Sequence, residues 1–434
     1  MKNVNVFWFR RDLRLKDNHG LYQALMAGKT VVPVFIFDPR ILSPLKSKSD
    51  ARVEFIFNEL KGLNEELDQK GHGSIQIFFK EPLEVFKELK NTYEISQVFY
   101  NEDYEPYAIK RDQRVTDFLE KNDIKAQGFK DHVIFSPNEV LKADGTPYLV
   151  YTPFNKSWMK RFRQKEFVTY PSENHLDKIS DIRPTKIREL SDIGFKPSNI
   201  EVPSKSLYKS ALKSYSETRN FPALKNGTSK IGVHLRFGTV SVRHCVNVAQ
   251  NHSKTWFDEL IWREFFSMIL YHFPQSVDSA FKEKYSRIPW REDSEDFSRW
   301  CEGKTGYPFV DAGMRELVAT GYMHNRVRMV VASFLCKHLL LPWTWGERFF
   351  AEHLLDYDLS SNVGNWQWAA GCGVDAAPYF RIFNPQSQMD KFDPDLVYVK
   401  HWVPEMDQPE YFEPMVDHEY ARRRALKTYK ESLE

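Results

Sequence analysis

Short apolar runs alternate with amphipathic stretches through the first 135 residues. Four runs are rich in Val, Ile and Phe and predict strands: Val4–Phe9, Val31–Phe37, Ile75–Phe79 and Ile95–Tyr100. Apolar positions recur at helical spacing between them: Gly20–Ala27, Ala51–Gln69 and Leu83–Thr92. We expect a fifth strand near residues 133–135. The alternation predicts a Rossmann-like α/β domain, in which helices cover both faces of a five-stranded parallel sheet.

The pattern changes after this region. The stretch from about residue 170 to 205 is rich in Pro, Ser, Lys and Asp, which is typical of a long surface connector. From there to about Leu359, helical spacing recurs with short loops between. The sequence thus predicts an α/β domain over residues 1–135, an interdomain linker over 136–205 and a larger all-helical domain over 206–434.

Composition narrows the class of protein. A chain of 434 residues is too long for one ordinary core, and a net charge of +2 requires any nucleic-acid surface to be a local patch. The scattered cysteines form no CxxC pair, and no histidine pair has ligand spacing, so we expect no metal site. The start of the chain is charged too early for a signal peptide, and no apolar run approaches the roughly 20 residues of a membrane span. We therefore expect a cytoplasmic protein.

One nearly charge-free segment, residues 362–385, combines two indoles, an amide and a guanidinium: Trp366, Trp368, Asn362 and Arg381. Helix positions two apart point about 200° from one another. Trp366 and Trp368 should therefore face different neighbours, as in a wall shared by two pockets. The alternative interpretation is a tryptophan-rich helical core.

Two further segments place mixed chemistry on one helix face. Glu259, Trp262 and Arg263 stand at positions i, i+3 and i+4, a set that can bind a flat heterocycle attached to a phosphate. The alternative is an exposed face with an i,i+4 ion pair. The same spacing recurs in a second helix, where it groups an amide, a guanidinium and a thioether: Asn325, Arg328 and Met329.

Two loops carry hydrogen-bonding groups. Asp356 and Asp358 precede Asn362, and such carboxylates can accept hydrogen bonds from a ribose, a ring N–H or Arg328. A helix cap is the alternative. Residues 228–232 precede a helix, and their hydroxyl and backbone N–H groups suit a pyrophosphate.

In this order along the chain, the motifs resemble the photolyase/cryptochrome family, closest to the class I cyclobutane pyrimidine dimer (CPD) DNA photolyases. The resemblance extends from residues 9–17 to 402–405. It implies a flavoprotein lyase that performs light-driven DNA repair with FAD bound in the helical domain. Excited reduced FAD donates an electron to a flipped-out dimer, the ring splits and the electron returns.

The resemblance also implies the FAD ligands, which are Tyr215, Thr228, Ser229, Lys230, Ile231, Gly232, Trp256, Arg263, Asn325, Arg328, Asp356, Asp358 and Asn362. Asn362 matches the residue that faces flavin N5 and stabilises the one-electron and reduced states. At Gly232 the family often has Ser, so a hydroxyl contact is lost there while the backbone N–H remains.

Three tryptophans match the family's electron-hopping chain, which reduces the flavin in light and is separate from repair: Trp366, Trp343 and Trp290. Core packing explains any one of them, but their separations of 23 and 53 residues match the family as a set. With Glu259 and Asn362 they complete the implied catalytic set.

The implied dimer and DNA contacts are Arg219, Glu259, Trp262, Arg263, Asn325, Arg326, Arg328, Met329, Trp368, Arg381 and Gln388. Trp262 and Trp368 would form an apolar slot for the dimer. Glu259, if protonated, would donate a hydrogen bond to a pyrimidine carbonyl. The (6-4) photolyases carry histidines where this chain has Asn325 and Met329, which argues against that lesion.

Further expectations follow from the resemblance. Members of the family often hold a second, antenna chromophore of deazaflavin or folate type, and residues 101–107 resemble the deazaflavin-binding members more. The partner is DNA that contains cyclobutane pyrimidine dimers, bound by a monomer. The alternative function is a cryptochrome-type blue-light sensor without repair activity. The full set of cavity residues favours repair, and the chain ends without the tail that sensors often add.

Overall fold

The computed structural model describes residues 1–182, 187–207 and 209–434. Packing groups the chain into two units. One, which we name the sheet unit, comprises Met1–Val140, Trp158–Ser206 and Ile231–Val248. The other, the helical unit, comprises Leu141–Ser157, Leu207–Lys230 and Ala249–Glu434. The units interleave along the chain, whereas the boundaries predicted from the sequence run in chain order.

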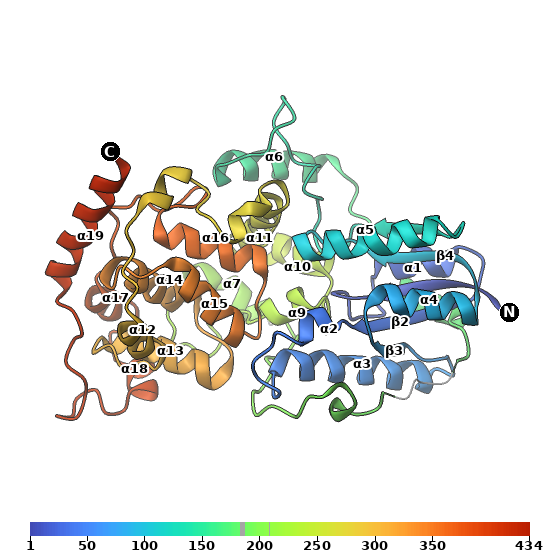
Figure 1. The fold of residues 1–434 in the computed structure, drawn as a ribbon, viewed down its shortest axis with the longest axis horizontal. Coiled ribbons are helices and arrows are strands. Elements are labelled where there is room, and N and C mark those ends of the chain that lie inside the picture. The colour runs from blue at the N-terminus through green and yellow to red at the C-terminus, as the bar shows by residue number, and fades with distance from the viewer. Residues whose placement is uncertain (183–186, 208) are drawn as a thin grey trace. The chain divides into compact units, whose positions relative to one another are not determined.

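Five parallel strands form the sheet in the order β3-β2-β1-β4-β5, which confirms the predicted architecture. The strands are β1 (Asn3–Phe9), β2 (Val31–Phe37), β3 (Gln76–Phe79), β4 (Glu94–Asn101) and β5 (Lys125–Phe129). The helices between them are α1 (His19–Met26), α2 (Pro39–Leu42), α3 (Ala51–Gln69), α4 (Pro82–Thr92) and α5 (Pro106–Glu120). Figure 1 shows α3 and α5 on opposite sides of the sheet. Every residue of β2 is buried, because helices cover both faces of a parallel sheet.

The fifth strand is not where the sequence predicted it. β5 lies at Lys125–Phe129 and pairs in parallel with β4, while residues 133–135 form no strand. As an edge strand, β5 is only partly buried and lacks a continuous apolar run. Residues 133–135 are buried in a loop instead, where Phe135 packs edge-on against Trp158 with 5.2 Å between ring centroids. The apolar run indicated burial and not strand pairing.

A buried ion-pair cluster lies just beyond β5. Asp131 accepts hydrogen bonds from Arg14 at 2.6 and 2.7 Å and from Arg243 at 2.7 Å. Burial by itself raises the pKa of Asp131, but the two guanidinium groups outweigh burial and hold that pKa well below its usual range. Arg243 also pairs with Asp17 at 2.9 Å. These bonds tie the segment Ile231–Val248 to the sheet unit.

Helices make up most of the remaining chain, as predicted. They are α6 (Tyr151–Gln164), α7 (Lys209–Lys213), α8 (Tyr215–Thr218), α9 (Gly232–Arg236), α10 (Val242–His252), α11 (Lys254–His272), α12 (Ser294–Cys301), α13 (Pro308–Thr320), α14 (Asn325–Ser333), α15 (Trp343–His353), α16 (Leu359–Ala370), α17 (Pro385–Phe392), α18 (Val397–Trp402) and α19 (His418–Leu433). A single π-helical turn, Phe334–His338, follows α14 directly.

The helix α16 carries the first part of the segment singled out in the sequence, up to Ala370. It begins after Asp358, whose carboxylate accepts a hydrogen bond from the Ser361 N–H at 3.1 Å, and it ends at Gly371 in the left-handed region with φ of 88°. It packs against α11 and α15. The contact with α15 requires a glycine, because a Cβ at Gly346 would overlap the ring of Trp366.

Candidate functional site

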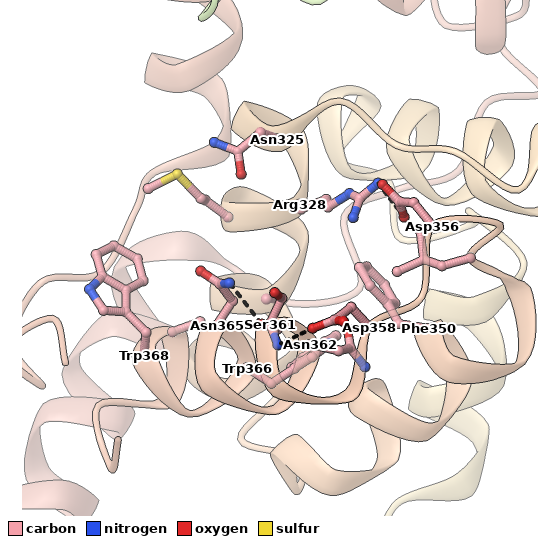
Figure 2. Close-up of a pocket in the computed structure, with 14 residues that line it drawn as sticks. Asn325, Arg328, Phe350, Asp356, Asp358, Ser361, Asn362, Asn365, Trp366 and Trp368 are labelled. Atoms are coloured by element: carbon pink, nitrogen blue, oxygen red, sulfur yellow. Dashed lines mark hydrogen bonds and ion pairs between the residues drawn. The ribbon is translucent and has the colours of Figure 1, made fainter. Parts of the chain in front are cut away.

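A pocket lies between α14 and α16, and α15 and the loop before α16 close one end of it (Figure 2). It holds about 610 Å³ of space free of protein atoms, open solvent included. Eight residues predicted from the sequence line it: Asn325, Arg328, Met329, Asp356, Asp358, Asn362, Trp366 and Trp368. The other lining residues are Ala332, Phe350, Leu354, Ser361, Asn365 and Ala369.

An ion pair forms the charged end of the pocket. Arg328 donates to the two carboxylate oxygens of Asp356 at 3.1 and 3.0 Å, and its Nε donates to the Met323 carbonyl at 2.7 Å. Burial by itself lowers the pKa of Arg328, but Asp356 outweighs burial and raises it. Figure 2 shows this pair far from Trp368, which stands at the other end of the α16 face. Asp358 serves as the helix cap that the sequence left open as one interpretation.

The amide of Asn362 is held in one orientation by a residue that the sequence analysis did not single out. Its Nδ2 donates to the carbonyl of Glu347 at 3.1 Å and to Oε1 of the same residue at 2.9 Å. Both side chains are buried. Burial raises the pKa of Glu347, and the hydrogen bonds from Asn362 and Tyr357 oppose that rise. Because both amide hydrogens are used, Oδ1 is the atom that Asn362 has left to offer a ligand.

A second group of predicted residues gathers around Tyr322. The hydroxyl of Thr228 lies 3.4 Å from the Tyr322 hydroxyl. The ammonium of Lys230 lies 5.0 Å from the centre of the Tyr322 ring, and the guanidinium of Arg328 lies 5.6 Å from it. Tyr322 therefore links the hydroxyl-rich loop to the charged end of the pocket.

The same loop contacts α11. Trp256 donates from Nε1 to the Ser229 hydroxyl at 3.2 Å. Tyr215 begins the short helix α8, where the guanidinium of Arg219 lies 5.6 Å from its ring centre. Burial raises the pKa of Tyr215. Two predicted ligands that follow in this loop belong to the sheet unit, and their part in the site stays a prediction: Ile231 and Gly232.

Glu259 and Trp262 lie one turn apart on α11. Glu259 forms an ion pair with Arg219. Burial raises the pKa of Glu259, and the charge of Arg219 opposes the rise. Trp262 stacks on Tyr151, with 3.6 Å between ring centroids and 5° between planes. Tyr151 thus covers one face of the indole. Neither Glu259 nor Trp262 is among the lining residues of the pocket.

The remaining predicted DNA contacts also stand outside the pocket. Arg326 donates to Oδ1 of Asn220 at 2.7 Å. Gln388 is half-buried on α17, Arg263 is half-buried on α11 and Arg381 is exposed. The structure therefore brings eight predicted residues together in one pocket, and the role of the others stays a prediction.

The three tryptophans predicted to carry electrons belong to the apolar core of the helical unit. Trp343 and Trp366 are buried, and Trp290 packs partly buried against the same core. Trp366 has ring contacts with Trp300 and Phe350, at 6.2 and 5.0 Å between centroids. The order of electron transfer among the predicted three stays a prediction.

Among the residues that the structure describes, no three His, Cys, Asp or Glu side chains gather as metal ligands. No helix in this described part of the chain has the length and apolar character to cross a membrane.

Comparison with known proteins gives consistent matches. Residues 5–172 match the family model of DNA photolyase, and residues 256–410 match that of the FAD binding domain of DNA photolyase. A deoxyribodipyrimidine photo-lyase of Synechococcus sp. is 35% identical over 429 residues, covering 92% of this chain and 88% of its own length. A class III photolyase from Agrobacterium tumefaciens superposes with a TM-score of 0.84 at 30% identity, over 100% of this chain and 98% of its own. A photolyase from Sulfolobus tokodaii, solved with two FAD molecules, superposes with a TM-score of 0.83 at 33% identity, over 99% of this chain and 100% of its own.

The chain belongs to the DNA photolyase family. It is accordingly an enzyme of light-driven DNA repair with FAD as its cofactor, as the resemblance in the sequence implied. The cryptochrome alternative is not favoured, because the curated relatives that match over nearly the full length are photolyases.

The pocket of this photolyase fits a flavin dinucleotide in its chemistry. Carboxylates and amides line it, so acceptors are present for the N–H groups of a flavin ring and the hydroxyls of a ribose. The Tyr322 group adds hydroxyls and a lysine, which suit phosphates. Apolar contact surface comes from Phe350, Leu354 and Trp366.

Three residues with clear contacts in this photolyase were missed by sequence reasoning: Glu347, Tyr322 and Tyr151. Each acts through a partner distant in the chain, so spacing alone carries no signal for it. Glu347 lies 15 residues from Asn362 and Tyr151 lies more than a hundred from Trp262. Tyr322 lies 94 residues from Thr228, although it stands only three residues before the predicted Asn325.

Proposed function

We propose that the pocket between α14 and α16 holds the flavin ring and that the loop at residues 228–230 holds the phosphates of FAD. Support comes from the ion pair of Arg328 with Asp356, which leaves carboxylate lone pairs for ring N–H groups or a ribose. Thr228, Ser229 and Lys230 supply the polar groups for phosphates. FAD bound there supplies the light-driven electron; the protein positions it and sets its environment.

We propose that the oxygen of Asn362 accepts a hydrogen bond from flavin N5–H. Both amide hydrogens of Asn362 point to Glu347, which leaves Oδ1 for the pocket. An acceptor at this position favours the flavin states in which N5 carries a hydrogen over the oxidised state, in which N5 is itself an acceptor. Glu347 thereby acts as a positioning residue.

We propose that the substrate is DNA containing a cyclobutane pyrimidine dimer, flipped out of the duplex against the open end of the pocket. Trp368 and Met329 offer an apolar surface there, and Asn325 is exposed beside them. Glu259, with its raised pKa, stays protonated at higher pH than an ordinary glutamate and can then donate to a pyrimidine carbonyl. Residues 325 and 329 are not histidines, which favours this lesion over the (6-4) product.

The surrounding basic residues are proposed to hold the DNA backbone: Arg219, Arg263, Arg326 and Arg381, with the amide of Gln388. Such contacts read phosphates and not bases, so binding should depend on the lesion and on salt and little on sequence. We propose that the protein acts as a monomer in the cytoplasm, where a reducing environment suits its four free cysteines.

A second, antenna chromophore is proposed for the sheet unit at residues 101–107, of deazaflavin type in preference to folate. Asp103 and Glu105 pair with Arg11 at 3.1 and 2.9 Å, so this segment is a polar, ordered part of the unit. The Sulfolobus tokodaii photolyase carries two FAD molecules, which is consistent with a second chromophore in a protein of this fold.

Binding in the dark tests the dimer site separately from the photochemistry. Oligonucleotides with a cyclobutane thymine dimer, with a (6-4) product or without damage are titrated by fluorescence anisotropy. We expect selective binding of the cyclobutane dimer. Trp368→Ala should weaken it about tenfold, since stacking on an aromatic side chain contributes roughly 1–3 kcal/mol per base. Trp402→Ala, which changes a partly buried tryptophan outside the pocket, is the matched control. Equal affinity for the undamaged strand would refute the proposed site.

A further inference from the structure

A continuous row of aromatic rings leaves the pocket wall in a direction that the sequence did not predict. Trp366, which lines the pocket, contacts Trp300 with 6.2 Å between ring centroids and 70° between planes. Trp300 is fully buried, and its indole N–H donates to the Val331 carbonyl at 3.4 Å. This carbonyl is a hydrogen-bond acceptor but not a base.

The row continues to a partly exposed indole. Trp300 stacks on Phe297 with 5.7 Å between centroids and 20° between planes. Phe297 in turn meets Trp345 edge-on at 5.2 Å. Trp345 lies in the first turn of α15 and is partly exposed. Among the residues that the structure describes, no hydrogen-bond partner is seen for its indole N–H.

We infer that Trp300 and Trp345 form a second route by which electrons reach Trp366, in addition to the predicted route through Trp343 and Trp290. This inference rests on the role predicted from the sequence for Trp366, as the residue from which light-driven flavin reduction takes its electron. It deepens that proposal, since it adds two residues and a second point of exit to solvent.

The steps balance in electrons and protons. Trp366 gives one electron to the bound cofactor and becomes a cation. Trp300 then reduces the Trp366 cation and becomes a cation itself. Trp345 in turn supplies an electron to Trp300 across the ring of Phe297, which bridges the two indoles without being oxidised. The Trp345 cation releases its indole proton to water. A soluble thiol finally returns one electron and one proton, and two thiol sulfurs oxidised in this way join as a disulfide.

The end of the route follows from the surroundings of each indole. Trp300 has no base on its N–H and no access to water, so its oxidised form keeps the proton and remains ready to accept an electron. Trp345 can lose its proton to water, which traps the oxidised site at the surface. Core packing alone accounts for Trp300, but it does not require an indole at the partly exposed Trp345.

The test uses the FAD-loaded full chain and flash excitation of the oxidised cofactor, with transient absorption of tryptophan radicals as the readout in place of repair. The variants are Trp290→Phe, Trp300→Phe and Trp345→Phe, singly and in pairs. Phenylalanine keeps an aromatic ring at each position, so the packing stays nearly intact. Trp402→Phe serves as the matched control, and Trp366→Phe removes the shared entry point.

With Trp290→Phe, we expect a surface tryptophan radical to persist, with formation that slows in heavy water because a proton leaves Trp345. Adding Trp300→Phe or Trp345→Phe should lower its yield at least about tenfold, while adding Trp402→Phe should leave it unchanged. If the pairs behave as Trp290→Phe alone, the second route does not exist. If Trp366→Phe itself leaves the radical yield intact, the proposed entry point is wrong, which is a different failure.

Discussion

Replacing Glu347 with alanine should lower the reduction potential of the bound flavin. The carboxylate accepts one of the two amide hydrogens of Asn362 at 2.9 Å, and the other goes to the Glu347 carbonyl at 3.1 Å. Glu347→Ala leaves only the second bond. With one bond in place of two, the amide can rotate as a whole about χ2. Its NH₂ group then faces the pocket and donates to N5 of the oxidised flavin, and Oδ1 no longer accepts from N5–H.

The magnitude follows from the bonds exchanged. A buried hydrogen bond contributes about 1–1.5 kcal/mol, and more when its acceptor is charged. For a one-electron couple, about 1.4 kcal/mol corresponds to about 59 mV. We therefore expect the potential of the couple that adds hydrogen at N5 to fall by roughly 60 mV in Glu347→Ala. Glu347→Gln keeps an acceptor oxygen and should stay close to the unmodified protein.

Potentiometric titration of the flavin absorbance measures the effect in the FAD-loaded protein. Thermal unfolding of the same three proteins controls for packing, because the shorter side chain also leaves a cavity. If Glu347→Ala loses thermal stability while its potential equals that of Glu347→Gln, then Glu347 supports only the packing and the positioning role is refuted.

Three more predictions concern stability and pH. Burial raises the pKa of Glu259. The contribution of its protonated form to the free energy of unfolding should therefore be full below the pKa of the unfolded state and lost as pH rises through the folded pKa. Glu259→Gln should remove this pH dependence in denaturant titrations. Asp131→Asn removes the carboxylate that pairs with buried Arg14 and leaves Arg243 with Asp17 alone, which should cost about 3–5 kcal/mol in urea unfolding; no loss would show that the cluster is solvated. Gly346→Ala should displace Trp366 and lower the free energy of unfolding by about 1–3 kcal/mol, which Tm and tryptophan fluorescence would report. Gly62→Ala, with open space around its Cβ, should be neutral or stabilising.

The sheet could be predicted closely because its central strands are continuous apolar runs. β2 begins and ends at the predicted residues, Val31–Phe37. The edge strand β5 was missed, since its residues Lys125–Phe129 are only partly buried and resemble a loop in composition. Local pattern thus predicts the strands that carry an apolar run, the edge strand β3 included, and fails at β5, which has none.

In the site, the sequence could group residues that share one helix face, but it could not find contacts made across the fold. Trp366 and Trp368 both line one pocket and not two, but their surroundings differ: the first is buried against Trp300, and the second is partly exposed. The acceptor for Asn362 lay beyond reach, because only the packing of α15 on α16 brings Glu347 to it.

The most direct test of the account is illumination of the reduced, FAD-loaded protein with a thymine-dimer oligonucleotide, following dimer loss against a dark control. The account predicts light-dependent return of intact thymines and no repair in the dark. A flavin-containing protein that binds the oligonucleotide but leaves the dimer intact in the light would contradict it.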